Sequence, residues 1–149
     1  MIYIVEHQDE RLPEIIQAVA QIEKDTFSDA WSETNIEGAV KQDYNKLFVI
    51  YNENSLVLGY LMSSFVAGET ELLRIAVKSG ERKKGRGKLL INEYLSYAKK
   101  LCTRGFLEVR DGNAVARNIY EKLGYKEIAT RKNYYHNPAE DGIIYEIRF

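Results

Sequence analysis

Six cations and three glycines lie close together between residues 78 and 88. The cations are Lys78, Arg82, Lys83, Lys84, Arg86 and Lys88. Because Glu81 is the one acidic residue among them, the segment has a charge of +5 on a chain whose net charge is −1. Gly85 and Gly87 lack the Cβ atoms that would keep an anion away from the backbone. The segment therefore indicates a site for a small polyanion rather than for nucleic acid, which requires an extended basic face.

The basic glycine loop, residues 82–87, follows a predicted strand and opens a predicted helix. Helix N-termini expose unpaired N–H groups and a partial positive charge, so they bind phosphates. A nucleoside triphosphate loop is excluded because Arg86 and Gly87 replace the Lys and Ser/Thr of G-x-x-x-x-G-K-[ST]. A dinucleotide fingerprint is excluded because Leu90 stands in the position of its third glycine. The alternative to a phosphate site is a solvated basic helix start without a ligand.

The spacing Arg82-x-x-Gly85-x-Gly87 resembles the Q/R-x-x-G-x-G/A acetyl-CoA loop of the GNAT acetyltransferases. Segments on both sides of the loop resemble the RimI branch of this family, whose members acetylate the α-amino group of a ribosomal protein. These segments are residues 27–33, 71–77, 107–110, 113, 120–125 and 131–141, so the resemblance covers essentially the whole chain. It implies that acetyl-CoA is the cosubstrate.

The resemblance also implies which residues hold acetyl-CoA. Backbone N–H groups from Ile75 to Val77 would bind the pantetheine arm and polarise the acetyl oxygen. Asn113, which is also a natural helix N-cap, resembles the residue that holds the pantetheine arm. The remaining cofactor contacts fall on Ala76 and on Arg82, Lys83, Lys84, Gly85, Arg86, Gly87 and Lys88.

Acetyl transfer to an amine requires a neutral amine, a polarised thioester and a protonated leaving thiolate. An α-amino group has a pKa of about 8, against about 10.4 for Lys, so one carboxylate suffices to remove its proton near neutral pH. The resemblance assigns this base to Glu108, whose alternative role is a structural ion pair with Arg110 on the same strand face. It assigns the acid to Tyr120, which lies on the helical face of Asn113; the alternative is that Tyr120 only packs.

Four residues are candidates for contact with the acceptor: Trp31, Arg74, Tyr134 and Tyr135. The alternative for the aromatic residues is packing in the core or in a loop. Arg74 stands where the RimI pattern usually has Asn, and Gly142 and Tyr145 replace the usual Ala and Met. We expect a protein N-terminus as the acceptor, with a small amine or a Lys side chain as the alternative. A non-catalytic module that binds acetyl-CoA or contacts RNA is a more remote alternative.

Strands and helices must position these residues, and the spacing of apolar residues predicts where these elements lie. The patterns predict strands over 2–6, 47–51, 56–65, 71–77, 106–110, 125–131 and 143–149, and helices over 12–22, 33–42, 85–102 and 113–123. Ser32 is the predicted N-cap of the second helix, and Gly124 is the predicted stop of the fourth. The expected fold is α+β: a GNAT fold whose mostly antiparallel mixed sheet is flanked by helices, with a central β-α-β unit that binds acetyl-CoA.

Length and composition predict a single N-acetyltransferase domain over residues 1–149. The one cysteine, Cys102, excludes an intramolecular disulfide. No segment has the layout of a signal peptide or the roughly 20 apolar residues of a membrane helix, so we expect a cytoplasmic protein without membrane contact. His7 and His136 form no metal-ligand spacing, so no metal is expected. The expected partners are coenzyme A and a peptide or protein N-terminus, with a ribosomal protein as the first candidate, and the expected state is a monomer.

Overall fold

The structure is a computed structural model that describes residues 1–149. Its strands are β1 (Ile2–Val5), β2 (Asn45–Tyr51), β3 (Val57–Val66), β4 (Glu69–Val77), β5 (Arg104–Arg110), β6 (Lys126–Tyr135) and β7 (Glu140–Arg148). Its helices are α1 (Leu12–Thr26), α2 (Glu33–Val40), α3 (Arg86–Ala98) and α4 (Ala114–Lys122). None of the four helices combines the length and the apolar composition that crossing a bilayer requires.

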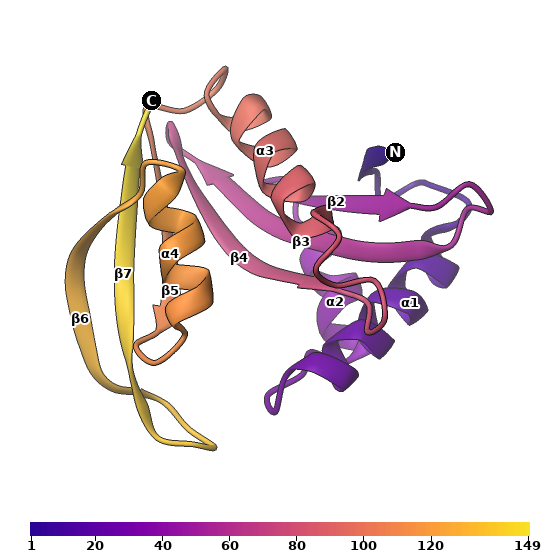
Figure 1. The fold of residues 1–149 in the computed structure, drawn as a ribbon. Coiled ribbons are helices and arrows are strands. Elements are labelled where there is room, and N and C mark those ends of the chain that lie inside the picture. Colours follow the sequence, from indigo (N-terminus) through magenta and orange to yellow (C-terminus); the bar gives the residue numbers. More distant parts are fainter.

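The strands form one sheet in the order β1-β2-β3-β4-β5-β7-β6 (Figure 1). Strands β2, β3 and β4 pair antiparallel, and β4 pairs parallel with β5 through α3 as the predicted β-α-β unit. The remaining pairs, β1 with β2, β5 with β7 and β6 with β7, are antiparallel. The expected mixed and mostly antiparallel sheet is therefore confirmed.

Helices cover both faces of the sheet and bury two apolar clusters. Helices α1 and α2 pack on one face, where Ile15 and Ile36 meet Val49 and Tyr60 of the sheet. Helices α3 and α4 pack on the other face, against residues such as Leu61. Alternation along β2 explains this arrangement, since successive side chains of a strand point to opposite faces. The sheet is thus the middle of three layers (Figure 1).

An irregularity in β4 changes which face its side chains reach. Met62 of β3 pairs with Arg74, and the next residue, Ser63, pairs with Leu72, so Leu73 has no partner. Strict alternation would place Leu72 and Arg74 on one face. The extra residue reverses the alternation, as in a β-bulge. Leu72 therefore packs on the α3/α4 face, whereas Arg74 reaches α1.

The same part of the sheet contains a gap. Strands β4 and β5 pair over only four positions, the last of which joins Leu72 to Leu107. Beyond this pair β4 continues to Val77 beside β3, and β5 continues to Arg110 beside β7. The two strands diverge toward these ends, so the sheet splays open in its middle (Figure 1).

The predicted elements are present, although several ends differ by two to four residues, and the predicted signals at two helix ends are confirmed. Ser32 caps α2 in a capping box with Asn35, and Gly124 follows α4 with a left-handed φ of 105°. The predicted helix over 85–102 is too long: α3 ends at Ala98, and Leu101 beyond it is 58% exposed. The polar loop between the last two strands is also shorter than expected, because pairing of Tyr135 with Glu140 extends both strands.

Candidate active site

A cavity of about 640 Å³ lies where β4 and β5 diverge. Its walls come from the connector between α1 and α2, from β4, β5 and α4, and from the turn between β6 and β7. The lining residues are 26–29, 72–75, 108–110, 113, 116, 120, 135, 137 and 138. Because the gap passes through the sheet, side chains from both faces reach one space.

Glu108 is the acidic residue of β5 on this cavity. Its side chain points away from α3 and α4, since its neighbours Leu107 and Val109 are buried on that face. One carboxylate oxygen, Oε1, lies 3.3 Å from Nε of Arg131. The other oxygen, Oε2, is buried without a hydrogen-bond partner. An unpartnered buried acceptor is costly to the folded state, and Glu108 keeps this oxygen available for a donor that enters the cavity.

The alternative ion pair of Glu108 with Arg110 does not form. Arg110 instead pairs with Glu140 at 3.3 Å and donates to the carbonyl oxygens of His136 and Pro138. A second carboxylate, Glu71 on β4, is close enough to interact: burial and the charge of Glu108 raise the pKa of Glu71. The base candidate thus lies beside another acidic group as well as Arg131.

Tyr120 reaches the cavity from α4 on the opposite face of the sheet. The residue is 7% exposed, and its ring packs edge-on against Tyr125 with 5.7 Å between the ring centroids. Burial, with a smaller contribution from Tyr135, raises the pKa of Tyr120 to about 12. The phenol therefore keeps its proton at neutral pH and can donate it.

Helix α4 carries both Tyr120 and Asn113 to the cavity. The Asn113 side-chain oxygen accepts a hydrogen bond of 3.2 Å from the N–H of Ala116, so Asn113 is the N-cap as predicted. Arg117 anchors the helix: its guanidinium donates to the hydroxyl of Tyr145 at 2.9 Å and pairs with Asp111 and Glu127. Tyr145, which departs from the usual Met, thus helps to hold α4.

The basic glycine loop presents a run of free backbone donors. None of the N–H groups of residues 82–88 donates a hydrogen bond to another protein atom. Gly85, the N-cap of α3, has a φ of 80°, a conformation that favours glycine. A Cβ added at Gly87 would meet only Val77, at 3.9 Å. The loop backbone is therefore open to an anion.

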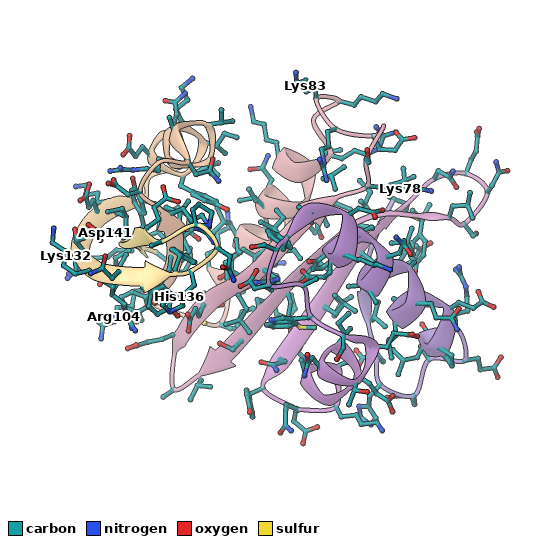
Figure 2. The ribbon with its side chains drawn as sticks, turned by 90° about the horizontal axis from the view of Figure 1, so that it is seen from below. Lys78, Lys83, Arg104, Lys132, His136 and Asp141 are labelled. Atoms are coloured by element: carbon teal, nitrogen blue, oxygen red, sulfur yellow. The ribbon has the colours of Figure 1, made fainter.

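The loop side chains divide into two groups. Lys78, Lys83 and Lys88 are exposed and lie beyond 4 Å of any carboxylate, and Figure 2 shows Lys83 at the outer end of the loop. Arg86 and Lys84 pair with Glu81. Arg82 binds the protein itself, with Nε on the carbonyl of Val77 and Nη2 on the hydroxyl of Thr26, both at 2.9 Å.

The acceptor candidates lie in different surroundings. Arg74 and Tyr135 line the cavity, whereas Tyr134 is 46% exposed and stacks with Arg131. Trp31 does not line the cavity, because its ring packs against the core and the guanidinium of Arg74.

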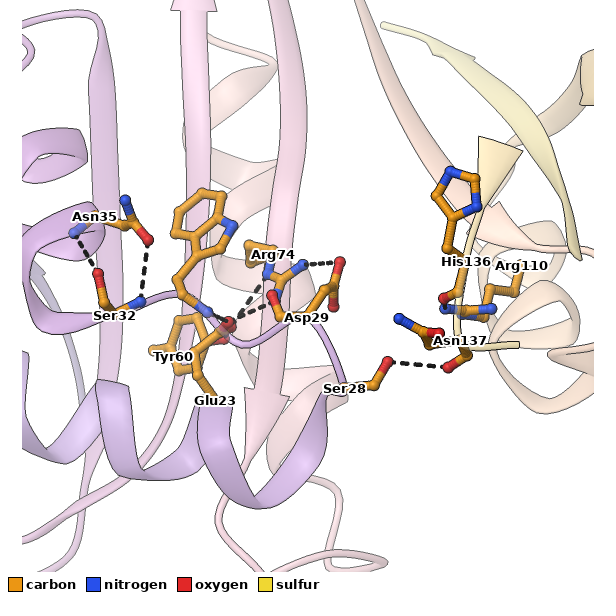
Figure 3. Close-up of polar contacts among 11 residues, drawn as sticks. Glu23, Ser28, Asp29, Ser32, Asn35, Tyr60, Arg74, Arg110, His136 and Asn137 are labelled. Atoms are coloured by element: carbon orange, nitrogen blue, oxygen red, sulfur yellow. Dashed lines mark hydrogen bonds and ion pairs between the residues drawn. The ribbon is translucent and has the colours of Figure 1, made fainter. Parts of the chain in front are cut away.

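Residues in two loops that received no individual role from the sequence complete the cavity. The connector contributes residues 27–29, and the turn contributes Asn137 and Pro138. Ser28 Oγ donates to the carbonyl of Asn137 at 3.1 Å, so the two loops touch (Figure 3). The available signal was their position between regular elements, where binding residues commonly lie.

Comparison with known proteins agrees with this geometry. The sequence model described as "Acetyltransferase (GNAT) family" matches residues 13–125. The chain belongs to the GNAT acetyltransferase family. As a GNAT protein of this type it is an acetyl-CoA-dependent N-acetyltransferase.

Its relatives include named RimI-type enzymes. The [ribosomal protein bS18]-alanine N-acetyltransferase of Haemophilus influenzae is 32% identical over 120 residues, which are 80% of this GNAT chain and 80% of that protein. The enzyme of the same name from Salmonella typhimurium is 32% identical over 135 residues, covering 87% and 88%. The crystal structure of the Escherichia coli ribosomal-protein-S18-alanine N-acetyltransferase superposes with a TM-score of 0.85 at 27% identity, covering 99% of this chain and 94% of that one. The expected GNAT fold and RimI-like relationship are confirmed.

Proposed function

We propose that this enzyme transfers the acetyl group of acetyl-CoA to the N-terminal α-amine of a protein, with a ribosomal protein as the acceptor. Two observations support the acceptor class. The RimI-type relatives are named as enzymes that acetylate an alanine of a ribosomal protein, and the chain aligns with more than four-fifths of the Salmonella enzyme. The observation that carries the chemistry is the meeting of Glu108 and Tyr120 on one cavity that passes through the sheet.

Acetyl-CoA fits the α3/α4 side of this cavity. Free N–H groups of residues 82–88 would hold the pyrophosphate, while Lys83, Lys84 and Lys88 add positive charge. The edge of β4 from Ile75 to Val77 has no strand beside it beyond the pair of Leu72 with Leu107, so it can pair with an extended amide chain. Asn113 caps α4 with its amide oxygen, which leaves the amide nitrogen to donate. Bound here, acetyl-CoA supplies an activated thioester.

Glu108 is the proposed general base. Its unpartnered Oε2 accepts a proton from the acceptor ammonium, directly or through one water, while Oε1 stays paired with Arg131. The neutral amine then attacks the acetyl carbon. Backbone N–H groups at Ile75 to Val77 would polarise the acetyl oxygen.

Tyr120 is the proposed general acid. Its pKa of about 12 keeps the phenol protonated until a leaving thiolate develops beside it. The phenol donates this proton to sulfur as the C–S bond breaks, and the second proton that the attacking nitrogen loses restores the phenol. The products are the acetylated amine and coenzyme A, and the base and acid come from opposite sides of the sheet. Because the two groups stand on separate elements, each can be changed without moving the other.

The acceptor would enter between the two loops that touch through Ser28 and Asn137 (Figure 3). Tyr135 lines this side of the cavity. The α-amine would then lie near Glu108, on the face of the sheet opposite α4.

An acceptor panel tests the proposed function. The purified protein is given acetyl-CoA with an Ala-initiated peptide, the same peptide with a blocked N-terminus and one internal Lys, and a small polyamine. We expect acetylation of the free N-terminus alone, located by mass spectrometry. Faster modification of the blocked peptide or of the polyamine would overturn the N-terminal acceptor, while no transfer to any acceptor would overturn the proposed chemistry.

A further inference from the structure

Arg74 lines the cavity, but contacts within the protein already occupy its guanidinium group. Its side chain is 14% exposed, and Nη2 lies 2.5 Å from Oε1 of Glu23 while Nε lies 3.2 Å from Oε2. Glu23 is fully buried, at 0% exposure. A buried carboxylate requires such a partner, because an unpaired charge in the core is strongly destabilising. Arg74 and Glu23 therefore form one fixed unit between β4 and α1.

This unit also holds the connector between α1 and α2. The guanidinium carbon of Arg74 lies 4.3 Å from the ring centre of Phe27 and 5.1 Å from that of Trp31. Nη1 lies 3.6 Å from the carboxylate of Asp29, and Nη2 lies 3.4 Å from its carbonyl oxygen. Glu23 adds a further tie, since its Oε1 accepts the backbone N–H of Trp31 at 2.8 Å (Figure 3).

The connector is a wall of the cavity, and Arg74 anchors it together with Glu23. Phe27, Ser28 and Asp29 all line the cavity, and the opposite wall is the turn at Asn137. Without these contacts the connector would have to be ordered by the acceptor, and such ordering reduces affinity. The unpaired residue Leu73 turns Arg74 toward α1, so the contact between Arg74 and the connector depends on this irregularity in β4.

We propose that Arg74 is a positioning residue that sets the affinity for the acceptor by holding the connector from Phe27 to Trp31 in its binding conformation. This inference rests on the proposed function, because it takes the cavity between connector and turn as the acceptor site. Arg74 acts through the connector and needs no contact with acetyl-CoA or with the reacting atoms. It replaces the direct acceptor contact that the sequence predicted for this residue.

Arg74→Lys tests the proposal because lysine keeps the charge opposite Glu23 but loses the planar fork and the stacking. We expect the KM for an Ala-initiated peptide to rise about tenfold, equivalent to about 1.4 kcal/mol, with kcat and the KM for acetyl-CoA within twofold of wild type. A residue with a general structural role would lower kcat and raise both KM values together, or reduce the folded fraction.

Trp31, the single tryptophan of the chain, gives an independent signal from the connector. Acrylamide should quench the fluorescence of Trp31 more strongly in Arg74→Lys than in the wild-type protein. Arg104→Lys is the matched control, since Arg104 also pairs with a carboxylate, Glu69, and stacks on an aromatic ring, that of Phe106, but lines no part of the cavity. This control should leave both the peptide KM and the quenching unchanged.

A peptide KM within twofold of wild type in Arg74→Lys would overturn the positioning role while leaving the proposed function intact. Absence of peptide acetylation by the wild-type protein would overturn both. If Arg74→Lys fails to bind acetyl-CoA, Glu23→Gln repeats the test, because glutamine keeps the shape of Glu23 and removes the charge that orients Arg74. A peptide KM raised at least threefold in Glu23→Gln supports the proposal, and an unchanged KM overturns it.

Discussion

Glu108 and Tyr120 project from opposite faces of the sheet and line the same cavity. This is possible because β4 and β5 stop pairing after Leu72 and Leu107, immediately before Glu108. An intact sheet would separate the two side chains by its own backbone. The splay therefore permits the proposed base on one side and the proposed acid on the other to face one space.

Glu108→Gln should lower kcat/KM for peptide acetylation by about 100-fold at pH 7, since a general base contributes on this scale. The loss should shrink at pH 9.5, where an α-amine with a pKa of about 8 is already neutral. Rates measured from pH 6.5 to 9.5 check this. Glu69→Gln, which changes a carboxylate at the other end of the β4–β5 pairing, is the control and should match wild type. A loss that is the same at every pH would contradict the base role.

Tyr120→Phe should lower kcat by about 100-fold while the KM for acetyl-CoA changes little, because only the proton donor is removed. Tyr125→Phe is a matched control: its ring packs against that of Tyr120, and its buried hydroxyl has no hydrogen-bond partner. Removal of that hydroxyl should leave kcat and the melting temperature almost unchanged. Equal activity of the two variants would remove the acid role from Tyr120.

Gly87→Ala separates cofactor binding from folding. Position 87 lies inside α3 with open space around its Cβ, so alanine should stabilise the free protein by about 0.5 kcal/mol. The same methyl group would obstruct a phosphate on the loop backbone, and the KM for acetyl-CoA should rise about tenfold. Thermal melting and initial rates measure the two effects. A variant with an unchanged KM would show that the cofactor does not approach the backbone at this residue.

Alkaline pH should destabilise the fold through its buried tyrosines. Burial raises the pKa of Tyr120 and of Tyr135 to about 12. A pKa higher in the folded state than in the unfolded chain means that this stability is complete below pH 10 and is lost as the pH rises toward 12. The melting temperature should fall over this interval, and Tyr135→Phe should reduce the slope. A melting temperature that stays constant from pH 9 to 12 would contradict the burial of these phenols.

The sequence by itself determined the local elements and the position of the basic glycine loop. Regular spacing of apolar residues, the cap at Ser32 and the stop at Gly124 act over a few neighbouring positions, so they can be read without the fold. The loop from Arg82 to Gly87 is likewise a contiguous signal. Contacts between residues that are far apart in the sequence leave no comparable pattern in the chain.

Only the tertiary structure decided what surrounds each site residue. Glu108 pairs with Arg131, which comes from β6, two strands away in the sheet, rather than with Arg110 of its own strand. Arg74 meets Glu23, 51 positions away in the chain, because one unpaired residue in β4 turns it to the other face. A one-residue change in strand register changes which side chains meet along the rest of the strand, but it leaves the amino-acid composition unchanged. The partners of the site residues are therefore decided by the fold.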